Sequence, residues 1–291
     1  MSAGEANAKH LAKGECEHEQ NDTEECILNA WEKHGGKIMI KVIMHGCNGR
    51  MGQTIANLIA DDFAIEIVAG IDISNHIENS FPVFEKLQDC EVEADVIIDF
   101  ASSKATDDLL TYCIDKKLPC VLCTTGLSEE QLKKVEDAAR KVAILKSANM
   151  SLGINMLLKI VKEAARILVP AGFDVEIVEK HHNQKLDAPS GTALALADSI
   201  NEEMNFEYSY KYDRSMDRRK RPQKEIGISA IRGGTIVGEH DVIFAGADEV
   251  ITFSHAAYSK AVLGKGAVQA AKFLAGKTAG LYDMSHVIDA E

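Results

Sequence analysis

The sequence predicts an α/β protein in which a doubly wound, parallel-sheet domain is joined to an α+β domain with a mixed sheet. Three observations lead to this prediction. Apolar strand-like segments alternate with amphipathic helix-like segments over residues 39–150, as in parallel sheets with helices on both faces. After Ser151 this rhythm stops, and three strand-like segments follow one another. The chain has 291 residues, which is more than one hydrophobic core usually supports.

The first domain is expected to begin with the apolar run MIKVIMH. Its strands and helices follow from period-2 and period-3.6 apolar patterns, respectively. Strands are predicted at residues 39–45, 64–72, 94–100, 119–125 and 142–148, and helices at 50–60, about 105–115, and 128–140.

The second domain is predicted to open with a helix at 155–168 and a strand at 173–182, followed by a helix after Ser190. Further strands are expected at 225–234, 235–246 and 249–258. A final apolar helix, at about 264–274, is predicted to pack back onto the first domain. The domains are therefore residues 39–150 plus 261–291, and residues 151–260. Residues 1–38, which are polar, acid-rich and contain Trp31, are interpreted as a flexible appendage.

The formal net charge of −13 argues against nucleic acid or an anionic membrane as the main partner. It also means that an anionic substrate needs a local positive pocket. No apolar run reaches the roughly 18 residues of a membrane span, and no basic and apolar leader is present. We therefore expect a soluble, cytoplasmic protein. The basic run at residues 218–221 is interpreted as a solvated surface loop, because Pro222 ends it.

The seven cysteines are odd in number and lack the dense spacing of a secreted disulfide framework, so reduced thiols are expected. Cys120 and Cys123 form a C-x-x-C within a strand-like segment, where their odd separation directs them to opposite faces. A redox or metal pair is therefore disfavoured there. Cys16 and Cys26 lack a paired metal-ligand spacing, and no metal is expected.

A glycine loop follows the first predicted strand, in the sequence HGCNGRMGQTIANLIA. Glycines at a strand–helix junction allow a tight turn and a close approach of backbone N–H groups to a pyrophosphate. The spacing is G-x-x-G-x-x-G, and the motif alone is weak. Asp72 strengthens it, because it ends the second strand about twenty residues on, where a ribose-diol acceptor belongs. We therefore predict a Rossmann-type, dinucleotide-binding first domain, in preference to a plain turn with a surface acid.

The stretch EKHHNQKLDAPSGTALALAD is dense in groups that handle protons and anions. His181 and Lys185 are general-acid candidates, because imidazole titrates near neutrality and a buried ammonium is easily lowered toward it. Residues 189–192 predict a helix start whose N–H groups would hold a carboxylate. Taken alone, the stretch is explained better by a plain helix cap and a polar strand end. The preceding glycine loop reverses that preference.

Together these motifs resemble the dihydrodipicolinate reductase family, also called 4-hydroxy-tetrahydrodipicolinate reductase. The resemblance covers the chain from Met39 to its C-terminus and leaves out residues 1–38. It is carried, in order, by GCNGRMG, CTTG, SANMSLGIN, EKHHNQKLDAPSGTA and IRGGTIVGEH. The long H-H-x-x-K-x-D-A-P-S-G-T-A motif is the most specific of these.

The resemblance implies reduction of (2S,4S)-4-hydroxy-2,3,4,5-tetrahydrodipicolinate to (S)-2,3,4,5-tetrahydrodipicolinate with loss of water. This is a step in diaminopimelate and lysine biosynthesis, and its cofactor is NADH or NADPH. It further implies a homotetramer joined through the sheet of residues 151–260, the substrate-binding and oligomerisation domain. No nucleic acid, membrane or metal partner is expected.

The resemblance also assigns residues. His181 matches the proton donor and acceptor, and Lys185 a proton donor. The substrate-binding positions are His182, Ser190, Gly191 and Thr192. The cofactor-binding positions are Gly46, Cys47, Asn48, Gly49, Arg50, Met51, Asp72, Cys123, Thr124, Thr125, Ser147, Ala148, Asn149 and Met150.

Several positions depart from the family pattern and bear on the cofactor. Cys123 stands where a glycine is frequent, Met150 where an aromatic is frequent, and Ile73 where some members have an arginine. Asp72 favours NADH, because it accepts hydrogen bonds from the ribose and repels a 2′-phosphate. Lys260, at the return to the first domain, is equally a hinge-side residue or a surface lysine.

Two other functions stay open at this point. One is a Rossmann dehydrogenase acting on another amino or imino acid, such as a relative of aspartate or homoserine dehydrogenase. The other is a non-catalytic NAD(H)-binding sensor. The dense His-His-Lys and Ser-Gly-Thr motif argues against the first, and the paired acids His181 and Lys185 against the second.

Overall fold

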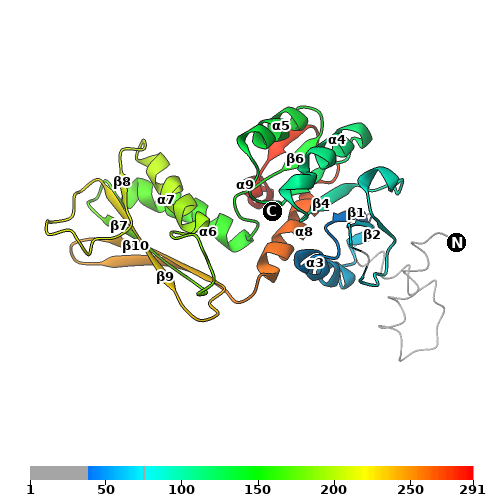
Figure 1. The fold of residues 1–291 in the computed structure, drawn as a ribbon. Helices are drawn as coiled ribbons and strands as arrows, with labels where there is room; N and C mark the ends of the chain where they lie inside the picture. The colour runs from blue at the N-terminus through cyan, green and yellow to red at the C-terminus, as the bar shows by residue number, and fades with distance from the viewer. Residues whose placement is uncertain (1–38, 75, 291) are drawn as a thin grey trace, which may run out of the picture.

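The computed structural model describes residues 39–74 and 76–290, which form two sheets with helices packed on them (Figure 1). The predicted appendage of residues 1–38, with Trp31, Cys16 and Cys26, lies outside the described residues. The predicted α/β class is confirmed, with a parallel sheet first and a mixed sheet second. Within the described residues, no helix combines the length and apolar character needed to cross a membrane.

The first sheet is seven-stranded, and every neighbouring pair in it is parallel. Its strand order is β12-β6-β5-β4-β1-β2-β3. The strands are β1 (Ile40–His45), β2 (Ile65–Ile71), β3 (Val83–Phe84), β4 (Val96–Asp99), β5 (Cys120–Leu122), β6 (Ala143–Leu145) and β12 (Gly280–Tyr282).

Helices cover both faces of this sheet (Figure 1). Alternate residues of β1 divide between the two cores, with Val42 and Met44 on one side and Ile43 on the other. One core contains α3 (Arg50–Ala60), α8 (Ala261–Leu274) and α9 (Met284–Asp289), and the other contains α4 (Thr106–Lys116) and α5 (Glu129–Ala139). Cys120 and Cys123 pack against opposite cores, as their odd spacing predicts.

The second sheet is five-stranded, in the order β11-β10-β7-β9-β8. It is mixed, because β7–β9 and β8–β9 pair in parallel while β10 pairs antiparallel with β7 and β11. The strands are β7 (Asp174–His181), β8 (Ser209–Lys211), β9 (Glu225–Arg232), β10 (Gly238–Ala245) and β11 (Val250–Ala257). Helices α6 (Leu152–Leu168) and α7 (Gly191–Glu203) share one apolar core with β7, β9 and β10.

Short elements were absent from the sequence prediction. These are β3, β8, β12, α9 and the 3₁₀ turns η1 (Leu87–Asp89) and η2 (Ser103–Ala105). Strands of two or three residues contain too few positions to establish an apolar period, and only pairing with a neighbour defines them. Helix α6 also begins three residues earlier than predicted, because the Ser151 hydroxyl accepts the Ile154 N–H at 3.3 Å and caps it there.

The basic run at residues 218–221 is only partly the solvated loop that was predicted. Residues 218–220 are exposed. Arg221 instead donates to Asp174 at 2.7 Å and Glu176 at 3.0 Å, and to the carbonyl oxygens of Val175 and Glu225. A planar guanidinium satisfies several acceptors in one plane, so Arg221 fastens the loop to the sheet.

Helix α8 returns to the first sheet, as predicted, and crosses the segment that follows β6 at very short range. A Cβ on Gly266 would lie 1.6 Å from the Met150 carbonyl oxygen, so only glycine permits this approach. The contact holds the Met150 backbone against α8. Because Met150 directly precedes Ser151, the N-cap of α6, the crossing also helps to place the start of α6.

We predict that Gly266→Ala destabilises the protein by about 1–3 kcal/mol, because the new methyl group meets backbone that must move. Gly264→Ala in the same helix is the control. There the Cβ meets the Leu58 side-chain tip at 3.1 Å, which can rotate away. Both changes gain helix propensity of about 1 kcal/mol. Equal melting temperatures for the two variants would contradict the close crossing.

Candidate functional site

The predicted cofactor residues collect at the carboxyl ends of strands in the first sheet. Residues 46–49 connect β1 to α3, and Arg50 and Met51 open that helix. Asp72 follows β2, residues 123–125 follow β5, and residues 147–150 follow β6. Ligands of open parallel sheets bind at this edge, where loops leave the strand ends.

The glycine loop has the geometry of an anion-binding turn. Gly46 has φ +81°, and an added Cβ would lie 2.9 Å from the Phe100 backbone. A Cβ on Gly52 would lie 2.3 Å from the Gly46 carbonyl oxygen. Helix α3 starts at Gly49 without a side-chain cap, so the N–H groups of its first turn remain free for a phosphate. These features fit a dinucleotide.

The Asp72 carboxylate anchors this loop. Its Oδ2 accepts the Asn48 N–H at 2.9 Å, and its Oδ1 accepts the Ser74 N–H at 2.9 Å. A carboxylate has about four acceptor sites, so capacity remains for a ribose hydroxyl. Asn79 supports the loop through two hydrogen bonds that were not predicted from the sequence. Its side chain donates to the Asn48 side chain at 2.8 Å and accepts from Gln53 at 2.9 Å.

The segment after β6 links the cofactor positions to the substrate positions. The Asn149 amide nitrogen donates to the Thr192 hydroxyl at 3.1 Å, and its oxygen accepts the Ser151 N–H at 2.8 Å. Buried Asn155 supports the segment by donating to the Asn149 carbonyl oxygen at 2.7 Å. Asn155 was not predicted, although its inward position on an apolar helix is the signal that could have found it.

The inner face of the second sheet ends in a polar cluster around His181. His181 is 8% exposed, and its Nδ1 lies 2.6 Å from Oε2 of fully buried Glu179. Arg232 on β9 holds both Glu179 oxygens at 2.7 Å through its two terminal nitrogens. Neither Glu179 nor Arg232 was predicted. An acid at an inward-facing position of an alternating strand was the available signal for Glu179.

Ser190 joins this cluster to helix α7. Its N–H donates to Glu179 Oε1 at 2.9 Å, and its hydroxyl accepts the Ala193 N–H at 3.1 Å as the helix cap. The same hydroxyl lies 3.1 Å from His240 Nε2. The plain cap considered for Ser190 is therefore correct, and the residue also contacts the polar cluster. His240, on β10, was not predicted.

The pKa values of three ionisable groups in the cluster lie below their usual values, for different reasons. Burial tends to raise the pKa of Glu179, but hydrogen bonds from Arg232, His181 and the Ser190 backbone leave it below its usual value. Burial lowers the pKa of His181, and Glu179 opposes this shift. Burial lowers the pKa of His240 to about 4, so that ring is neutral at physiological pH.

The remaining residues singled out in the second half of the chain are the catalytic candidate Lys185, the substrate candidates Gly191 and His182, and Lys260. Lys185 pairs with Asp187 at 2.9 Å, and the hydrogen bond from Lys185 lowers the pKa of Asp187. Gly191 begins α7, and nothing lies within 4 Å of where its Cβ would be. His182 is partly buried in the loop after β7. Lys260 is exposed and immediately precedes α8, a position consistent with a hinge-side residue and with a surface lysine.

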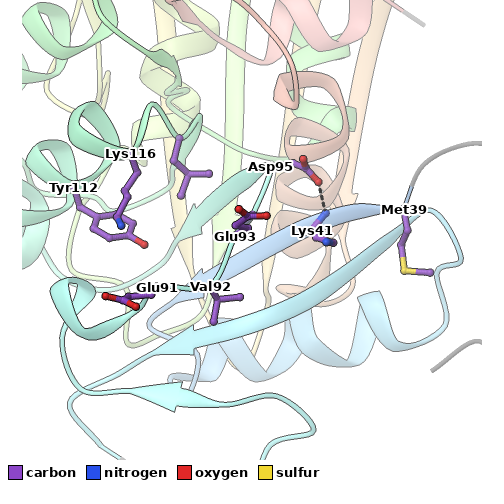
Figure 2. Close-up of a pocket in the computed structure, with 10 residues that line it drawn as sticks. Met39, Lys41, Glu91, Val92, Glu93, Asp95, Tyr112 and Lys116 are labelled. Atoms are coloured by element: carbon purple, nitrogen blue, oxygen red, sulfur yellow. Dashed lines mark hydrogen bonds between the residues drawn. The ribbon is translucent and has the colours of Figure 1, made fainter. Parts of the chain in front are cut away.

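A cavity of about 560 Å³ (Figure 2) has none of these residues in its lining. It is lined partly by residues at the amino ends of β1 and β4, including Lys41, whose backbone N–H donates to the Asp95 carboxylate at 2.8 Å. Because ligands of parallel sheets bind at the carboxyl ends, we do not assign the cavity to the site.

The arrangement combines an anion-binding loop, a buried histidine–carboxylate pair and an open helix start. The first suits a dinucleotide, the second a proton transfer, and the third a substrate carboxylate. Such a combination supports reduction of an unsaturated acid.

Two family models together match nearly all of the described residues. The family model "Dihydrodipicolinate reductase, N-terminus" matches residues 40–150, and "Dihydrodipicolinate reductase, C-terminus" matches residues 153–288. A 4-hydroxy-tetrahydrodipicolinate reductase of Caldanaerobacter subterraneus subsp. tengcongensis is 53% identical over 251 residues, covering 86% of this chain and 99% of that protein. The protein of the same name from Clostridium tetani is 47% identical, covering 87% and 98%.

A solved structure is also similar. It is a dipicolinate-bound dihydrodipicolinate reductase from Paenisporosarcina sp. TG-14, with a TM-score of 0.73 and 25% identity. The match covers 86% of this chain and 100% of that one.

Proposed function

Because this chain belongs to the dihydrodipicolinate reductase family, we propose that it reduces 4-hydroxy-tetrahydrodipicolinate to tetrahydrodipicolinate, with loss of water, using NADH or NADPH. One observation carries the proposal beyond family membership. The Asn149–Thr192 hydrogen bond holds the predicted cofactor edge against the predicted substrate edge. A reduction needs both edges at one place, because donor and acceptor must meet within contact distance.

The substrate is a dicarboxylate, and the site offers it two kinds of anchor. The start of α7 at Gly191 and Thr192 supplies backbone N–H groups and the positive end of a helix dipole. Lys185 supplies a mobile ammonium. The open space at Gly191 leaves room for a carboxylate to approach the backbone.

Proton transfer is proposed for His181 and Lys185. When NADH or NADPH is bound, its nicotinamide supplies the hydride. The electron density that develops on the substrate then needs a nearby acid, and general acids contribute about 10²- to 10⁴-fold to such steps. His181 is held by Glu179 at one nitrogen, which leaves Nε2 for the substrate.

The proposed cofactor preference follows from the end of β2. The Asp72 carboxylate disfavours a 2′-phosphate, and neighbouring Ile73 and Ser74 supply no cation. Arg50 is exposed and has no ion-pair partner among residues 39–74 and 76–290, so it is available to a phosphate. We propose that NADH is used at least as well as NADPH.

We further propose a cytoplasmic homotetramer in which residues 151–260 form the substrate and assembly domain, and residues 39–150 with 261–291 the cofactor domain. Free thiols at Cys47, Cys113 and Cys120 suit a reducing compartment. The described helices that pack on the second sheet share one face of it. The opposite face presents the Lys180–Glu239 and Lys180–Asp241 ion pairs to a second copy.

We predict oxidation of NADH when the protein is mixed with freshly generated product of dihydrodipicolinate synthase. NADPH should give an equal or lower kcat/KM. Binding of dinucleotide without turnover of any cyclic imine diacid would instead indicate a sensor, and a strong NADPH preference would overturn the assignment of Asp72.

We predict that His181→Gln and Lys185→Ala each lower kcat by about 10²- to 10⁴-fold, because each removes a proton donor. Lys133→Ala is the matched control, since Lys133 is an exposed lysine on α5. Unchanged turnover in both site variants would remove His181 and Lys185 from the reaction.

Light scattering should give a particle mass of four chains of 31.7 kDa each. Glu239→Lys should lower that mass, because it places a like charge beside Lys180 in the proposed interface. A monomer from the unaltered chain would contradict the tetramer.

A further inference from the structure

Glu179 is fully buried, and each of its carboxylate oxygens has two hydrogen-bond partners. Its Oε2 receives hydrogen bonds from His181 Nδ1 at 2.6 Å and from Arg232 at 2.7 Å. Its Oε1 receives one from Arg232 at 2.7 Å and one from the Ser190 N–H at 2.9 Å. A buried carboxylate is costly unless it is paired and hydrogen-bonded, and this one is both.

These contacts determine which nitrogen of His181 is available. An ionised carboxylate only accepts hydrogen bonds, so the facing Nδ1 must carry a proton. Nε2 is then the nitrogen that can gain or lose one. It faces Gly238, where an added Cβ would lie 3.1 Å from it, so no side chain at that position covers the nitrogen.

We propose that Glu179 is the positioning residue of His181, and that Arg232 keeps Glu179 ionised and correctly aimed. Glu179 fixes the ring and its tautomer, so that Nε2 delivers the proton. In that step the Nε2–H bond breaks, its electron pair stays on Nε2, and the proton passes to the reduced substrate. Nδ1 keeps its proton throughout. This inference rests on the proposed function.

The groups around His181 come from several elements. Glu179 precedes it on β7, and the loop after β7 adds Lys185 and Asp187. Arg232 lies across on β9, and the His240 ring on β10 meets His181 edge to face at 5.2 Å. His255, on β11, is the cross-strand neighbour of His240. The pKa of His181 is lowered, chiefly by burial and to a lesser extent by Lys185 and Arg232, while Glu179 opposes the shift.

Replacing Glu179 by glutamine tests the proposal. Arg232 would draw the amide oxygen, so the amide N–H₂ would face His181 and donate to Nδ1. The ring could then no longer keep its Nδ1 proton, and the pKa of His181 would fall. We expect Glu179→Gln to lower kcat by roughly 10²-fold near neutral pH. We also expect the pH at which kcat begins to fall to move downward, because an acid works only while protonated.

Glu225→Gln is the matched control. Glu225 is also a buried acid paired with an arginine, Arg214, in the same sheet. It lies seven residues from Arg232 along β9, roughly 23 Å at the rise of a strand. Glu225→Gln should therefore share any loss of stability and keep the unaltered pH profile. Glu179→Asp, which retains the charge, should recover part of the turnover and the original profile.

A second readout does not depend on turnover. In protein labelled with ¹⁵N in its histidine rings, the His181 signals are those missing from His181→Gln. They should show Nδ1 protonated in the unaltered chain and a lower midpoint of titration in Glu179→Gln. If Glu179→Gln and Glu225→Gln lose activity equally at every pH, and the His181 titration is unmoved, Glu179 is only structural.

These experiments distinguish an error in the proposed reductase activity from an error in the positioning role of Glu179. If the unaltered chain does not reduce the cyclic imine diacid, the proposed function is wrong, and the ring titration still decides whether Glu179 controls His181. If the unaltered chain turns over normally while Glu179→Gln matches it in rate and profile, only the positioning role is wrong.

Discussion

The buried charge of Glu179 is the constraint on which the site depends. A carboxylate without water must be surrounded by donors, and its donors here come from β7, β9 and the residue before α7. Satisfying one charge therefore fixes the register of β7 against β9 and the place where α7 starts. His181, the proposed proton-transfer group, and the start of α7, the proposed anion-binding site, consequently share one anchor, and neither can shift without leaving Glu179 short of a partner.

A second constraint joins this anchor to the cofactor edge. The Met150 carbonyl packs against α8 at Gly266, which has no side chain to obstruct it, and the next residue, Ser151, caps α6. Asn149 directly precedes these two points; its side chain donates to the Thr192 hydroxyl and accepts the Ser151 N–H. The carboxyl end of the segment is therefore held against α8 and α6, while the Asn149 side chain reaches α7. Packing at Gly266 therefore helps to place the proposed cofactor edge relative to the proposed substrate edge.

How far the sequence could predict this arrangement depends on the spacing of the residues. Helix α3 was predicted with its correct bounds, because a glycine loop precedes it and an apolar period follows. His181, Lys185 and Ser190 fall within ten positions, so their association needed only local geometry. Arg232 and His240 come from strands some 50 residues further on, and only the register of the mixed sheet brings them to Glu179. Mixed pairing leaves no local signal, so they were missed although both lie in IRGGTIVGEH.

The two ion pairs at the site have different parts in the proposed binding of a dianion by a chain of net charge −13. Arg232 is committed to Glu179, because separating them would leave an unpaired charge in the interior. Lys185 is paired with Asp187, whose side chain is 56% exposed. An exposed pair of this kind contributes only about 0–1 kcal/mol, so a substrate carboxylate can replace Asp187 at little cost. In the proposed site, the buried Arg232–Glu179 pair thus positions His181, while the exposed Asp187 leaves Lys185 available to the substrate.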